Sequence, residues 1–224
     1  MIDFFIGPFL VWFPRVAVYA FFVGAVLAHL NRYGSKTDWL KVISYKSLVI
    51  SAVAFRLLNV LMLSAAQYYV WAQSKFTQIL LDSPIDTTVP QEGIVGLFPG
   101  LFQTKLGYFF LYSWGRFWIN LILIFLVAYG FWAFLKLLKK HKERFFDTGE
   151  VELGFLMSLL VGWPNFVIFI PAVFLSVILV SIFRGIFLKE PYTTLGWPFI
   201  VAGAIAIVFG NYFITALNLG VLRI

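Results

Sequence analysis

Cysteine is absent from the 224 residues, which excludes disulfide bonds, thiolate zinc sites and cysteine nucleophiles. Charge is also scarce, because Asp, Glu, Lys and Arg make up only 12% of the chain, about half of their share in an average soluble domain. Polar stretches are too short to form the core of a separate soluble domain. A single polytopic domain over residues 1–224 is therefore predicted.

Apolar and aromatic side chains dominate the rest of the composition. The chain is 62% hydrophobic and 20% aromatic, with a mean hydropathy of +0.92. These values predict an all-α integral membrane protein, and at about 20 apolar residues for each crossing the length allows six or seven spans. Residues 1–30 have neither a basic start nor a small-residue cleavage site, so they are predicted to contain the first span and not a removed signal.

Six spans are predicted from the apolar runs, at residues 11–30, 48–71, 117–138, 151–161, 166–183 and 195–219. Residues 73–114 are predicted to form an extracytoplasmic loop insertion. Within it, residues 94–114 are apolar but interrupted by Pro99, Gly100 and Gly107. This part is predicted to be interfacial or re-entrant, with an ordinary seventh span as the alternative.

The basic residues fix the predicted orientation. The loops after spans one, three and five carry four, five and two Lys or Arg residues, eleven of the seventeen in the chain. Cytoplasmic loops are enriched in Lys and Arg, so both termini are predicted to lie outside. The chain is placed in a prokaryotic inner or plasma membrane as a multi-pass protein. The lipid bilayer is then its first partner, and the net charge of +7 gives no reason to expect nucleic acid.

Three acids, Asp147, Glu150 and Glu152, stand at the predicted cytoplasmic start of the fourth span. Acids at the edge of a membrane helix are costly to place and are by default a functional-site hypothesis. The simplest alternative is that they are N-terminal acids favoured by the helix dipole. A divalent metal site from the same acids lacks a nearby histidine, so no metal and no cofactor is predicted.

Two blocks of residues resemble those of type IV prepilin peptidases and preflagellin peptidases, the Gly-x-Gly-Asp membrane aspartyl proteases. The first is Gly149-Glu150-Val151-Glu152-Leu153 followed by Leu159-Leu160-Val161-Gly162-Trp163-Pro164. The second is Leu195-Gly196-Trp197-Pro198-Phe199-Ile200 with Ala202-Gly203 and Phe209-Gly210-Asn211. The blocks occur in the family's order, and the resemblance covers residues 136–219.

The resemblance implies two catalytic carboxylates on the cytoplasmic face. The second aspartate of the family corresponds to Glu150, and the first corresponds by topology to Asn31. Asp38 and Asp147 are the possible substitutes for the missing partner. A rival first position in residues 81–90 falls on the opposite membrane face in the predicted topology.

These replacements bear directly on the chemistry. An aspartyl protease needs two carboxylates that share one proton, and an asparagine at position 31 cannot titrate. Two functions stay open. The first is an aspartic-type endopeptidase that cleaves the leaders of pilin-like proteins and is degenerate in its usual pair of aspartates. The second is a non-catalytic scaffold or binding partner, either for pilin-like helices or for a secretion or pilus assembly. A small transporter, suggested by Arg56 and residues 94–114, is less favoured.

Overall fold

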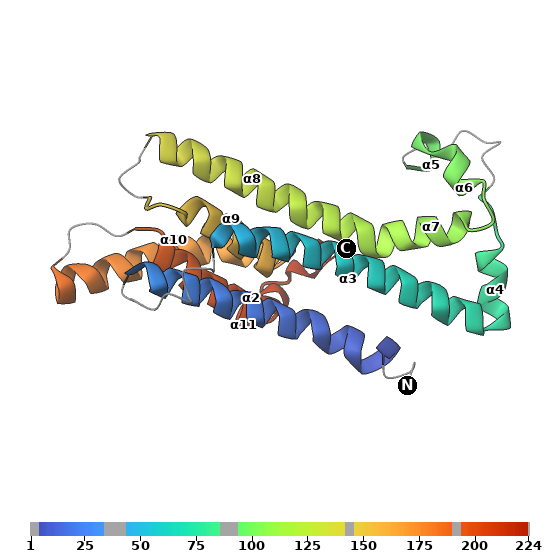
Figure 1. The fold of residues 1–224 in the computed structure, drawn as a ribbon, viewed down its shortest axis with the longest axis horizontal. Helices are drawn as coiled ribbons and strands as arrows, with labels where there is room; N and C mark the ends of the chain where they lie inside the picture. Colours follow the sequence, from blue (N-terminus) through green and yellow to red (C-terminus); the bar gives the residue numbers. More distant parts are fainter. Residues whose placement is uncertain (1–4, 34–43, 86–93, 142–145, 190–193, 224) are drawn as a thin grey trace. The chain divides into compact units, whose positions relative to one another are not determined.

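The structure is a computed structural model that describes residues 5–33, 44–85, 94–141, 146–189 and 194–223. All regular elements in these ranges are helices, as predicted (Figure 1). A helix hydrogen-bonds its own backbone N–H and C=O groups, which have no hydrogen-bond partners in the hydrocarbon of a bilayer. Five helices of the described ranges are long and apolar enough to cross a membrane: Gly7–Asn31, Tyr45–Gln73, Gly107–His141, Phe166–Phe187 and Gly196–Ala216. The fold is therefore that of an all-α, multi-pass membrane protein.

Five of the six predicted spans correspond to these long helices. The main elements are η1 (Phe5–Phe9), α2 (Leu10–Tyr33), α3 (Tyr45–Gln73), α8 (Ile119–His141), α10 (Phe166–Phe183) and α11 (Gly196–Ala216). Their ends agree with the predicted ranges to within a few residues, because each apolar run stops at a group of charged, glycine or proline residues.

The segment before α8 differs from its prediction. Residues 94–102 form only the short helices α5 (Ile94–Leu97) and α6 (Pro99–Phe102). From residue 107, however, α7 (Gly107–Ser113) and η3 (Trp114–Trp118) run without interruption into α8. The long helix thus begins ten residues earlier than the predicted start at residue 117. The strong helix breakers all precede residue 108, and one later glycine costs a helix only about 1 kcal/mol.

The predicted fourth span forms a helix that is too short to count among the five. This helix, α9 (Glu150–Val161), has 12 residues. At 1.5 Å per residue it is about 18 Å long, against a hydrocarbon thickness of about 30 Å. It is also deeply buried, with Leu153, Leu156 and Met157 fully covered. In the described structure α9 is a core helix of the bundle.

The chain divides into two compact units. Unit 1 comprises Met1–Phe13 and Arg56–Ile122, and unit 2 comprises Pro14–Phe55 and Leu123–Ile224. Unit 1 holds the predicted loop insertion, which includes α4 (Lys75–Leu81). Its small core gathers Trp71, Leu81 and Phe109, and the Ser64 and Ser113 hydroxyls hydrogen-bond at 2.9 Å.

Unit 2 contains the region that carries the family resemblance. In it, α9 and α11 run parallel, since Glu150 bonds Gly196 at their N-terminal ends and Met157 lies against Gly203 further along. The connecting helix α10 must therefore run antiparallel to both. Met157 and Gly203 are in close contact, because a Cβ at position 203 would lie 2.8 Å from the Met157 sulfur.

The other helices of unit 2 follow the same alternation. His29 lies beside Gly196 and Phe22 beside Gly203, so α2 is antiparallel to α11. Tyr45, at the start of α3, bonds His29 near the end of α2. The ends of α2, α8 and α10 and the starts of α3, α9 and α11 therefore gather at one end of unit 2, on the left in Figure 1. We refer to it as the Glu150 end.

Candidate functional site

Glu150 occupies the first position of α9, directly after a glycine in the left-handed region. Gly149 has a φ of 84°, a conformation that glycine adopts at little cost. The Glu150 side chain turns back at this point, and its Oε2 accepts a hydrogen bond from the Asp147 N–H at 2.9 Å. Glu150 and Glu152 both lie in the first turn of α9, where the helix dipole favours acids. Their predicted place at a helix N-terminus is confirmed.

The Glu150 carboxylate also bonds the start of α11, which lies 45 residues further along the chain. Oε1 accepts the Gly196 N–H at 2.7 Å, and Oε2 accepts the Leu195 N–H at 3.2 Å. The Thr194 side chain adds another hydrogen bond. The first N–H groups of a helix have no partner within the helix, so Glu150 caps α11 as well as its own turn. The carboxylate thereby joins the N-termini of two parallel helices.

Burial shifts the protonation of this group. The residue is only 2% exposed, and the loss of hydration raises the pKa of the Glu150 carboxyl above its ordinary value of 4.5. Hydrogen bonds from Asp147, Gly196, Thr194 and Leu195 oppose that shift because they favour the charged form, but burial outweighs them.

This shift predicts how stability depends on pH. A carboxyl whose pKa is raised by folding binds its proton more tightly in the folded state. The stabilisation is complete below the unfolded pKa and is lost as pH rises through the folded pKa. We therefore expect the thermal unfolding temperature to fall as pH rises from about 4.5 and then to level off, whereas Glu150→Gln removes this dependence. Unfolding in detergent, followed by circular dichroism across about pH 4 to 8, measures it.

Glu152→Gln is the control, because Glu152 shares the helix turn but is partly exposed. It should keep the wild-type dependence on pH. If wild-type stability instead rose with pH and Glu150→Gln removed that rise, the pKa of Glu150 would be lowered by folding and not raised.

A buried histidine lies next to the carboxylate. His29 is 1% exposed, and its Nδ1 lies 3.0 Å from the Tyr45 hydroxyl. A Cβ built on Gly196 would lie 3.0 Å from His29 Nε2 and 2.7 Å from Glu150 Oε1, so these two atoms are less than about 6 Å apart. The Trp197 ring meets the imidazole edge-on at 5.1 Å. His29 is thus a packed residue, and it belongs to the surroundings of Glu150.

The other predicted site residues have separate places. Asn31 lies in the last turn of α2, and its Oδ1 is buried with no hydrogen-bond partner among the described residues. Asp147 is exposed, and its Oδ1 accepts the Thr148 N–H at 2.6 Å. Asp38 lies outside the described residues. The roles predicted for these residues stay predictions.

The donor set around Glu150 differs from that of a metal site or a shared-proton pair. Its described hydrogen-bond partners are N–H and O–H groups. Within the described ranges, no group of three or more His, Cys, Asp or Glu residues is placed to hold a metal ion. The arrangement can hold one carboxylate firmly in place.

The partners of Glu150 were not predicted from the sequence. Leu195 and Gly196 contribute backbone N–H groups, which leave no side-chain signature in a sequence. They do belong to the second block of the family resemblance, and Glu150 belongs to the first. The hydrogen bonds of Glu150 therefore connect the two blocks that carry the resemblance.

Comparison with known proteins adds no assignment. No family model matches the chain, and neither a curated protein nor a solved structure matches it. The resemblance to prepilin peptidases rests on the residues quoted for it.

Proposed function

We propose that this chain is a prepilin-peptidase-like membrane protein that binds pilin-like transmembrane helices without cleaving them. In this proposal Glu150 has kept the position of a catalytic aspartate but serves to hold α9 and α11 together. The observation that carries the proposal is the saturation of its carboxylate. A carboxylate offers about four acceptor positions, and four donors meet this one: three backbone N–H groups and the Thr194 side chain.

A peptidase carboxylate has different requirements. It must activate a water molecule, reach the scissile carbonyl and share a proton with a second carboxylate. Glu150 is 2% exposed, and its carboxylate already accepts hydrogen bonds from four described donors. Asn31, at the corresponding first position, has no ionisable group. These features favour the non-catalytic alternative over an active endopeptidase.

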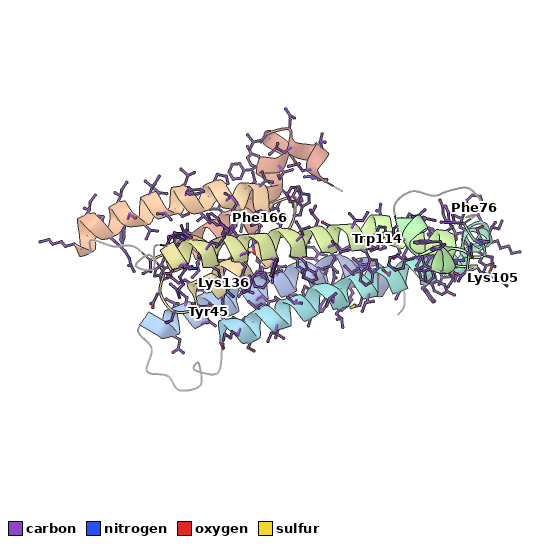
Figure 2. The ribbon with its side chains drawn as sticks, turned by 90° about the horizontal axis from the view of Figure 1, so that it is seen from above. Tyr45, Phe76, Lys105, Trp114, Lys136 and Phe166 are labelled. Atoms are coloured by element: carbon purple, nitrogen blue, oxygen red, sulfur yellow. The ribbon has the colours of Figure 1, made fainter. Side chains whose placement is uncertain are left out.

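The proposal includes the predicted topology of six crossings with both termini outside. It is supported by the alternating directions of α2, α3, α8, α9, α10 and α11 in unit 2. Basic residues also stand at the Glu150 end, among them Lys46 at the start of α3 and Lys139 and Lys140 at the end of α8. Figure 2 shows Tyr45 and Lys136 at this same end. In the proposal this end faces the cytoplasm, and α9 forms a short fourth crossing buried among its neighbours.

The test is a cleavage and binding assay with a prepilin-type substrate. We expect the purified protein in lipid nanodiscs to bind the substrate helix, measured by fluorescence energy transfer, and to leave the leader uncut between about pH 5 and pH 8. Glu150→Gln and Glu152→Gln serve as a matched pair. Cleavage by the wild type that persists in Glu152→Gln and is lost in a folded Glu150→Gln variant would show that Glu150 is catalytic. Absence of both binding and cleavage would contradict the proposed function.

A further inference from the structure

An apolar groove runs along α8 and α10, with α11 contributing to its wall. Its volume is about 590 Å³. The lining has no charged or polar side chain and consists of Val127, Gly130, Phe131, Phe134, Leu135, Leu138, Phe166, Ile170, Val173, Phe174, Val177, Leu195 and Phe199. Figure 2 shows the two long helices, with Lys136 labelled on α8 and Phe166 on α10. All of these residues belong to unit 2.

The groove is about as long as one leaflet of a bilayer is thick. On α8 it extends from Val127 to Leu138, which is about 16 Å at 1.5 Å per residue. This is about half of the hydrocarbon thickness of about 30 Å, which is the depth that the acyl chains of one phospholipid span in one leaflet.

Basic side chains follow the apolar lining at one end of the groove. On α10 the lining residues Ile170, Val173 and Val177 follow helical spacing, and Arg184 continues the same stripe seven residues after Val177. On α8 the last lining residue, Leu138, is followed at once by Lys139, Lys140 and His141. Both helices reach the Glu150 end at this point. The apolar lining of both helices is therefore followed by basic residues at the Glu150 end: Lys139 and Lys140 on α8, and Arg184 after α10.

We infer that this groove binds an anionic phospholipid, with its acyl chains between α8 and α10 and its phosphate at the Glu150 end. An apolar groove with cations at one end matches the two parts of such a lipid. A guanidinium can donate two parallel hydrogen bonds to a phosphate, which makes Arg184 the principal headgroup contact. The adjacent Lys139 and Lys140 add attraction for the negative charge. This site is independent of the proposed handling of pilin-like helices.

Lipid retention measured by native mass spectrometry tests the inference. The wild-type protein is equilibrated in micelles with equal amounts of phosphatidylglycerol and phosphatidylcholine. We expect it to retain phosphatidylglycerol in preference, and Arg184→Ala to lower that preference about fivefold. Gly130→Leu should reduce the retention of both lipids, because a Cβ at Gly130 meets nothing within 4 Å and a larger side chain can fill the groove without strain.

Gly115→Leu is the matched control, since a Cβ at Gly115 also meets nothing within 4 Å but the residue does not line the groove. Unfolding temperatures of all variants in the same detergent establish that they are folded. Equal retention of the two lipids by the wild type would overturn the inference. Unchanged retention in Gly130→Leu would also overturn it, as would displacement of the lipid by a synthetic apolar helix.

Discussion

Glu150→Ala is expected to lower the free energy of unfolding by about 3–5 kcal/mol. The substitution leaves three N–H groups without their acceptor, those of Asp147, Leu195 and Gly196. A buried donor that loses its partner costs about 1–3 kcal/mol. The bond to Gly196 is buried, whereas those to Asp147 and Leu195 are part-buried, so water recovers part of the cost there. Unfolding in mixed micelles with increasing denaturing detergent, followed by circular dichroism, measures the change.

Two further substitutions sharpen this prediction. Glu152→Ala removes an acid from the same turn of α9, but Glu152 is partly exposed, so a change within about 0.5 kcal/mol is expected. Glu150→Asp keeps the charge and shortens the side chain by one methylene, so the carboxylate cannot reach both helix starts. The free energy of unfolding of this variant should lie between those of the wild type and Glu150→Ala. If Glu150→Ala were as stable as Glu152→Ala, the carboxylate would not hold the two helices together, and the proposed function would lose its main support.

The long helices were predictable because each is encoded by a local feature, an apolar run with helix-ending residues on both sides. The predicted span at residues 166–183 coincides with α10, since a continuous apolar run ends at a glycine and proline turn on one side and at Arg184 on the other. The role of α9 was harder to predict, because a helix of only 12 residues fits both a short crossing and a buried core helix. Only its packing among the helices of unit 2 distinguishes the two.

The sequence predicted the position of Glu150 in the candidate site but not the residues that bond it. Acids following a glycine at the start of an apolar run indicate a helix N-terminus, and Glu150 lies at one. Its partners at Leu195 and Gly196 come from a distant helix and use backbone groups, so neither charge nor spacing pointed to them. His29 likewise had no signal that linked it to Gly196, because the contact depends on the antiparallel packing of α2 and α11.

Gly196→Ala is expected to destabilise the protein by about 2–4 kcal/mol, although alanine normally favours a helix over glycine by about 1 kcal/mol. The added Cβ would lie 2.7 Å from Glu150 Oε1 and would clash with the His29 ring. Both neighbours are buried, so neither can move aside without losing hydrogen bonds. The same unfolding measurement applies, with Gly115→Ala as the control. A Cβ at Gly115 meets nothing within 4 Å, so this control should be neutral or slightly stabilising.

A double-mutant cycle shows whether the clash with the carboxylate is the cause. Removing the Glu150 side chain takes away one of the two obstacles to a methyl group at position 196. The loss in Glu150→Ala/Gly196→Ala should therefore be smaller than the sum of the two single losses, by about 1–2 kcal/mol, as expected for residues in direct contact. Strict additivity would mean that Glu150 and Gly196 act independently, which contradicts the 2.7 Å hydrogen bond on which the coupling of α9 to α11 depends.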